Sequence, residues 1–108
     1  MTRDRLPNRR TCETFAFQHE HPGGATVELL CTLGYYADGR IGEVFFATDH
    51  HVGTQLDVAL KDACILLSFA LQHGAEVAKI RAAMTRDAQG RPEGIMGTLL
   101  DLLAGKQP

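Results

Sequence analysis

The segment TVELLCTLGYYADGRIGEVFFA, residues 26–47, decides the fold of this chain. Its first half, 26–36, alternates apolar with mostly polar positions, a pattern typical of a strand that packs one face on a core. Asp38-Gly39 follows, and a second β-rich run occupies 41–47. Because glycine takes the positive φ that a tight turn needs, Asp-Gly between two such runs predicts an antiparallel hairpin.

A further strand is predicted before this hairpin, because Phe15 and Phe17 alternate with smaller or polar residues. The segment HEHPGG at 19–24 is rich in residues that break regular structure, and it predicts a turn between the first two strands. The sequence therefore indicates a sheet of three antiparallel strands.

A long helix is predicted after the hairpin, from Thr54 to about His73. Thr54 and Asp57 have the spacing of a capping box, and Gly74 suits the position just after a helix. Most of the helix is apolar, so we expect it to be the central one. Its wide apolar face comprises Leu56, Ala59, Leu60, Ala63, Leu66, Leu67, Ala70 and Leu71, and its narrow polar stripe comprises Asp57, Lys61, Ser68 and Gln72.

Two shorter helices are predicted at 75–84 and 95–103, with a polar loop between them. Together the elements predict an α+β fold: a three-stranded antiparallel sheet followed by a long central helix and two shorter helices packed on one face. A single domain is expected at 11–104, between an irregular N-terminal arm at 1–10 and a tail at 105–108.

Composition narrows the classes of protein that remain. The 108 residues suffice for one domain, and 44% hydrophobic with 22% charged residues is ordinary for a globular protein. The net charge of −2 argues against a general nucleic-acid binder, which carries a basic excess. A small basic cluster near the start is either a solvated arm or a contact for an anion or partner; it comprises Arg3, Arg5, Arg9 and Arg10.

The cysteines Cys12, Cys31 and Cys64 are odd in number and widely spaced, which fits neither a zinc ribbon nor a redox pair. The first ten residues contain no apolar run, so no signal peptide is expected. The longest apolar segment is far shorter than a membrane span. We therefore expect a cytoplasmic protein without a cofactor.

Four stretches carry a resemblance to a known family: LPNRR at 6–10, DGRIGEVFF at 38–46, LLSFALQHG at 66–74 and MTRDAQGRPEGIMGTLLDLL at 84–103. The chain resembles the TSCPD domain family over roughly residues 7–104. That family includes the C-terminal region of adenosylcobalamin-dependent ribonucleotide reductases and short stand-alone bacterial proteins, and the chain is most similar to the stand-alone branch.

The resemblance implies a non-catalytic binding or regulatory module related to that accessory domain. Reductase chemistry needs a large barrel and a reducing cysteine pair, which a chain of this size with three scattered cysteines does not supply. The loop 49–54 lacks the lysine that the family often has there, and 94–97 lacks the family's Ser-Cys-Pro-Asp residues, so no metal or redox role is carried over. No Walker, dinucleotide or nucleophile-elbow motif is present, so enzyme activity is not favoured.

Four histidines form a candidate metal site. His19 and His21 lie two positions apart in extended chain and can point the same way, whereas the adjacent His50 and His51 point to opposite sides. His19 and His21 with either of the other two would suit Zn or Ni. The spacing matches no established zinc pattern, and structural or solvated histidines are the alternative.

The loop before the last helix is a candidate site for a small anionic ligand or nucleotide. Free N–H groups at a helix start attract anions, and an arginine binds phosphate or carboxylate with two hydrogen bonds. The alternative is a connecting loop in which the arginines pair with Asp87, Glu93 or Asp101. The candidate residues are Arg86, Arg91, Gly94 and Gly97.

Gly53 and Thr54, just before the long helix, form a second candidate anion site by the same reasoning. Simple N-capping by Thr54 is the alternative.

Leu30 and Phe45 are candidate interface residues. If Val44 and Phe46 face the core, Phe45 points to the other face of the sheet, where Leu30 is the apolar exception. This pattern predicts a homodimer or a contact with another protein through the open face of the sheet or a free edge.

Overall fold

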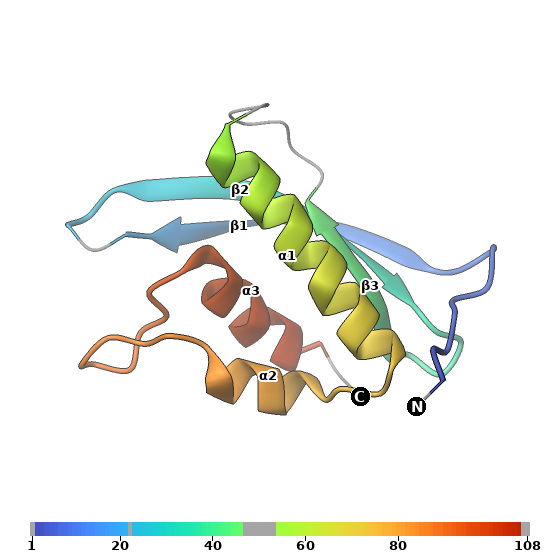
Figure 1. Ribbon diagram of the computed structural model, residues 1–108. Helices are drawn as coiled ribbons and strands as arrows, with labels where there is room; N and C mark the ends of the chain where they lie inside the picture. The colour runs from blue at the N-terminus through green and yellow to red at the C-terminus, as the bar shows by residue number, and fades with distance from the viewer. Residues whose placement is uncertain (1, 22, 47–53, 107–108) are drawn as a thin grey trace.

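The computed structural model describes residues 2–21, 23–46 and 54–106. Within these residues the chain forms three strands and then three helices, and Figure 1 shows the helices on one face of the sheet. The strands are β1 (Cys12–Glu20), β2 (Thr26–Tyr35) and β3 (Ile41–Phe46), and the helices are α1 (Gln55–Gln72), α2 (Val77–Ala83) and α3 (Ile95–Ala104). The predicted α+β fold is confirmed.

The sheet has the order β1-β2-β3, with both neighbouring pairs antiparallel. The predicted Asp38-Gly39 hairpin is present: Gly39 has φ 91°, and the Tyr36 N–H donates to the Arg40 carbonyl at 2.9 Å. The turn between β1 and β2 uses two glycines with positive φ, Gly23 at 97° and Gly24 at 94°. Local turn chemistry therefore sets the connections of the sheet.

The core lies between the sheet and the helices. The inner face of the sheet supplies Phe17, Leu29, Cys31, Leu33 and Val44, and the helices supply Cys64, Leu67, Leu71, Val77, Ile95, Leu99, Leu100 and Leu103. On the opposite face most strand side chains are smaller or polar, such as Thr14 and Thr32, whose hydroxyls lie 2.8 Å apart. Leu30 and Phe45 are the large apolar exceptions on that face. None of the described helices is long and apolar enough to cross a lipid bilayer.

Helix α1 runs along the free edge of β3 and closes it. The Ser68 hydroxyl accepts from the Val44 N–H at 2.9 Å and lies 3.1 Å from the Val44 carbonyl, and the Gln72 side-chain amide donates to the Gly42 carbonyl at 2.8 Å. Ser68 and Gln72 are four residues apart on the helix, a rise of about 6 Å. Val44 and Gly42 are two residues apart on the strand, a rise of about 6.6 Å, so the two spacings match. Backbone groups that would otherwise be open to a new strand are thereby satisfied.

This contact changes the predicted orientation of α1. The polar stripe includes the side chains that face the sheet edge: Gln72 is only 6% exposed. Two members of the predicted apolar face are in contrast open to solvent, Leu66 at 72% and Leu56 at 47%. The predicted apolar face was therefore too wide, because α1 packs against β3 and buries only part of that face.

Candidate functional site

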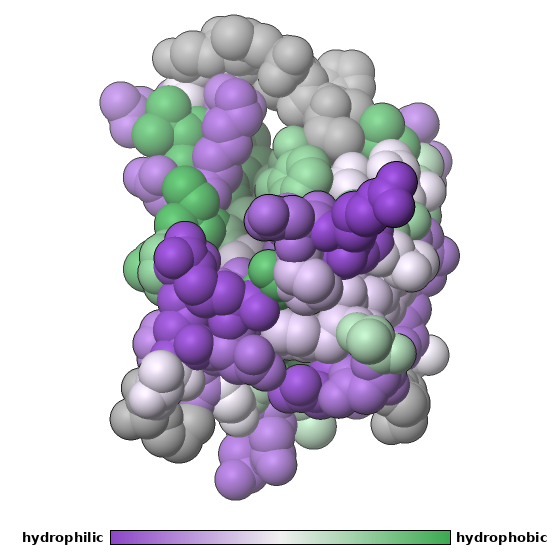
Figure 2. All heavy atoms as spheres, turned by 90° about the vertical axis from the view of Figure 1, so that its right-hand side faces the viewer, coloured by the Kyte–Doolittle hydropathy of each residue, from purple (hydrophilic) through white to green (hydrophobic). Residues whose placement is uncertain are grey.

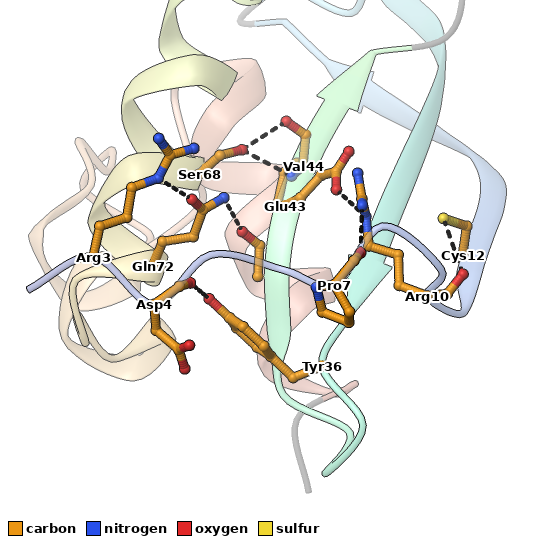
Figure 3. A network of polar contacts seen from close by, with 11 residues as sticks. Arg3, Asp4, Pro7, Arg10, Cys12, Tyr36, Glu43, Val44, Ser68 and Gln72 are labelled. Carbon is orange, nitrogen blue, oxygen red and sulfur yellow. Dashed lines mark hydrogen bonds and ion pairs between the residues drawn. The ribbon is translucent and has the colours of Figure 1, made fainter.

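The N-terminal arm, predicted as irregular, forms neither helix nor strand but is attached to the domain. The Asp4 N–H donates to the Gln72 carbonyl at 2.7 Å, and the Tyr36 hydroxyl donates to the Asp4 carbonyl (Figure 3). Arg10 forms an ion pair with Glu43 at 2.7 Å and also donates to the Pro7 carbonyl. The basic cluster is thus held beside α1 and β3.

A groove with a volume of about 710 Å³ lies between the arm, α1 and β3. We call it the arm groove and define it by its arginines and its large apolar side chains: Arg3, Arg5, Arg10, Phe45, Ile65 and Phe69. The arginines come from the arm, Phe45 from β3, and Ile65 and Phe69 from α1. Figure 2 shows this side of the molecule, where strongly hydrophilic side chains border smaller hydrophobic areas.

The arm groove is electropositive in a chain of net charge −2. Three arginines line it against one carboxylate, Glu43, which leaves two positive charges in excess. Glu43 pairs with Arg10 and raises the pKa of that guanidinium. Arg3 donates to the neutral Gln72 amide at 2.5 Å, and its guanidinium carbon lies 4.3 Å from the centre of the Phe69 ring. The Arg5 side chain has no ion-pair partner among the described residues.

A second groove opens on the other flank of α1. We call it the helix groove: its volume is about 340 Å³, and it is lined by Ala63, Leu66, Leu67 and Ala70 of α1, Ile80 and Met84 at α2, and Met96 and Leu100 of α3. Every one of these side chains is apolar. Leu66, at 72% exposed, stands at its side as the most exposed large apolar residue that the structure describes.

The interface residues predicted on the sheet lie where the register requires. Phe45 pairs with Thr32 and Leu30 with Ala16, so both point to the face opposite the helices. Phe45 is 43% exposed and Leu30 is half-buried. Phe45 also belongs to the arm groove, a connection that alternation along one strand does not reveal.

The structure brings together two of the four predicted metal ligands. The rings of His19 and His21 have centroids 4.8 Å apart and are nearly perpendicular, whereas His50 and His51 lie outside the described residues. His19 is 1% exposed, and its Nδ1 lies 2.8 Å from the Thr98 hydroxyl, while its Nε2 is buried without a hydrogen bond. Within residues 2–21, 23–46 and 54–106, no group of three or more His, Cys, Asp or Glu could hold a metal ion.

Burial lowers the pKa of His19, and the charge of His21 lowers it further; the Glu93 backbone acts in the opposite direction. The His19 imidazole is therefore neutral near physiological pH. Burial also raises the pKa of Cys31 and of Cys64 to about 12, so neither thiol supplies a thiolate at neutral pH.

The arginines of the predicted anion loop are paired with carboxylates. Arg86 donates to Asp101 at 2.7 Å and to the Gly90 carbonyl at 3.2 Å, and Arg91 binds Asp87 at 2.9 Å. An anion at this loop would have to displace Asp101 or Asp87. The pairing agrees with the alternative interpretation, a connecting loop whose arginines bind neighbouring carboxylates. The anion site itself stays a prediction.

The glycines of that loop have structural surroundings of their own. Gly94 is the N-cap of α3, with φ −112° and no side-chain hydrogen bond, and Gly97 is buried against Pro92. At the second predicted site, Gly53 lies outside the described residues, and the Thr54 hydroxyl accepts from the Asp57 N–H at 3.2 Å. Thr54 thus has the capping role that was its alternative.

No protein-family model matches the chain, and neither curated proteins nor solved structures contain a significant match. The resemblance to the TSCPD family therefore stays a prediction. The two grooves are the features that sequence reasoning missed; the basic cluster at 3–10 was the signal for one, and the excess of apolar positions on α1 was the signal for the other.

Proposed function

We propose that this chain is a non-catalytic binding module that forms a homodimer through the helix groove. The single observation that carries the proposal is the apolar helix groove with Leu66 exposed at its side. Exposed apolar side chains that are gathered in one patch mark interaction surfaces far more often than scattered ones do. The resemblance to TSCPD domains, many of which act as accessory or stand-alone modules, is consistent with such a role.

The surface has the form that a twofold dimer requires. In such a dimer the same patch meets itself, so a protruding side chain must lie beside the cavity that receives its copy. Leu66 protrudes from α1 at the side of the helix groove, and Met84 and Met96 on the opposite wall have flexible side chains that adapt to an inserted residue. Leu66 of each copy can then fill the helix groove of the other.

Chemical catalysis has little support from the described side chains. Cys31 and Cys64 are buried thiols with raised pKa values, and His19 is buried and bonded to Thr98. The ionisable groups that remain near the surface are mostly joined in ion pairs, such as Arg81 and Arg86 with Asp101. These observations favour binding over reaction.

Sedimentation velocity over a concentration series tests the dimer. Burying an exposed leucine contributes about 1.5–3 kcal/mol, and the change occurs twice in a symmetric dimer, so Leu66→Glu should weaken association by about 100-fold or more. Leu102→Glu is the matched control, since Leu102 is 40% exposed on α3 but does not line the helix groove. A wild-type protein that stays monomeric at about 0.5 mM, where even a weak dimer of micromolar Kd is populated, would overturn the proposal.

A further inference from the structure

The arm groove combines positive charge with exposed aromatic and aliphatic surface. Phe45 is 43% exposed, Ile65 54% and Phe69 44%, and arginines of the arm stand beside them. These residues come from three segments that are distant in sequence, and hydrogen bonds hold the arm in place at Asp4 and Arg10. The surface is therefore built by the fold.

We propose that the arm groove binds an acidic peptide segment of a partner protein, one that carries a bulky apolar side chain between its carboxylates. The proposal is independent of the dimer, because the arm groove and the helix groove lie on opposite flanks of α1.

The positive charge of the arm groove favours an acidic partner. The groove holds two positive charges in excess, although the chain as a whole is acidic. Arg5 has no ion-pair partner among the described residues, and Arg3 bonds only a neutral amide there, so both guanidinium groups are available to carboxylates. An arginine binds a carboxylate through two parallel hydrogen bonds, which adds direction to the attraction.

The apolar side chains of the arm groove account for the bulky apolar residue that we expect in the partner. Phe45, Ile65 and Phe69 offer a side chain of leucine or phenylalanine a surface from which water is released. The Arg3 guanidinium already lies over the Phe69 ring, so charged and apolar contacts adjoin within one site. A groove of about 710 Å³ has room for several side chains of a bound segment.

The backbone of β3 excludes one common way of binding peptides. An added strand needs free N–H and C=O groups at a sheet edge. At β3 the Val44 groups are bonded to Ser68 and the Gly42 carbonyl to Gln72. The partner is therefore recognised by its side chains, and specificity depends on the spacing of acidic and apolar residues.

A nucleic acid fits the arm groove less well. Phosphate-backbone binding depends on many cationic contacts along the strand, and the groove supplies an excess of only two charges within a chain of net −2. A short acidic peptide segment with two carboxylates would balance this excess of two positive charges.

A peptide array tests the proposal with the intact chain. Ten-residue peptides vary independently in their number of Asp and Glu residues and in their number of Leu and Phe residues, and fluorescently labelled protein is bound to the array. We expect signal only from peptides that have both features. Equal signal from acidic peptides without Leu or Phe, or from basic apolar peptides, would overturn the proposal, and so would no signal at all.

Variants then locate the site by fluorescence anisotropy with the strongest array peptide. Arg5→Glu should weaken binding at least about tenfold, because it replaces a charge-assisted contact by a repulsion, and Ile65→Ala should weaken it as well. Arg9→Glu is the matched control: Arg9 is an exposed arginine of the same arm that does not line the groove. Equal losses in Arg5→Glu and Arg9→Glu, or full competition by inorganic phosphate at the peptide's own concentration, would show a general charge effect and contradict the assignment.

Discussion

At the residue scale, the burial of His19 predicts a stability that depends on pH. The side chain is 1% exposed, with Nδ1 beside the Thr98 hydroxyl, and its pKa is lowered by burial. The folded protein therefore holds a neutral imidazole where the unfolded chain binds a proton at a pKa of about 6.5. A group whose folded pKa is depressed contributes stability above its unfolded pKa and loses it as the pH falls.

We predict that wild-type protein becomes less stable between pH 7.5 and pH 5, with the loss beginning near pH 6.5. His19→Leu should remove most of this dependence, because the variant has no proton to bind at this position. Chemical denaturation at several pH values measures the effect. This pH range is distinct from the range in which carboxylates act. The pKa values of Asp38, Asp87 and Asp101 are lowered, so the stability that these groups contribute is lost only at more acidic pH. Parallel curves for wild type and His19→Leu would contradict the account.

At the scale of elements, α1 and β3 are joined by side chains that act on backbone groups. Ser68 is bonded to both polar groups of Val44, and its hydroxyl also lies 2.8 Å from the Cys64 carbonyl of its own helix. Gln72 continues the contact four residues later, with Nε2 on the Gly42 carbonyl and Oε1 on Arg3. The sheet edge, the helix and the arm are therefore linked through two polar side chains.

Ser68→Ala should lower the free energy of unfolding by about 1–3 kcal/mol, because it leaves the N–H of the buried Val44 without its acceptor and removes the hydroxyl beside the Val44 carbonyl. Urea denaturation gives the value. Gln55→Ala, an exposed change at the first residue of the same helix, should shift stability by less than about 0.5 kcal/mol. If Ser68→Ala behaves like Gln55→Ala, the sheet edge does not depend on this contact.

The elements also show how far sequence reasoning reaches. The Asp38-Gly39 hairpin and the ends of α1 at Thr54 and Gly74 follow from local chemistry, and the structure has them as predicted. The direction in which α1 faces does not follow from its composition, since Ser68 and Gln72 contact backbone groups of β3 that lie 24 and 30 residues away in the sequence. Polar residues on one side of a helix face solvent unless the backbone groups of a sheet edge lie beside them and bind them.

At the scale of the whole molecule, the helices form two groups on one face of the sheet: α1 alone, and α2 together with α3. α1 packs on β3, while α3 packs beside β1 and contacts α2, as Figure 1 shows. Large side chains of α1 stay exposed on both of its flanks, Ile65 and Phe69 toward the arm and Leu66 toward α2 and α3. Neither groove was predictable from one segment, because each is lined by residues of three segments that only the fold brings together.

The central claim is that Leu66 of one copy fills the helix groove of another. Intermolecular NOEs in a sample that mixes isotope-labelled and unlabelled protein test it most directly, since they report only contacts between copies. The account predicts NOEs from the Leu66 methyl groups to the Met84 and Met96 methyl groups of the second copy, and none from Phe45 or Leu30. Intermolecular NOEs from Phe45 and Leu30 instead would place the dimer contact on the open face of the sheet and contradict the account.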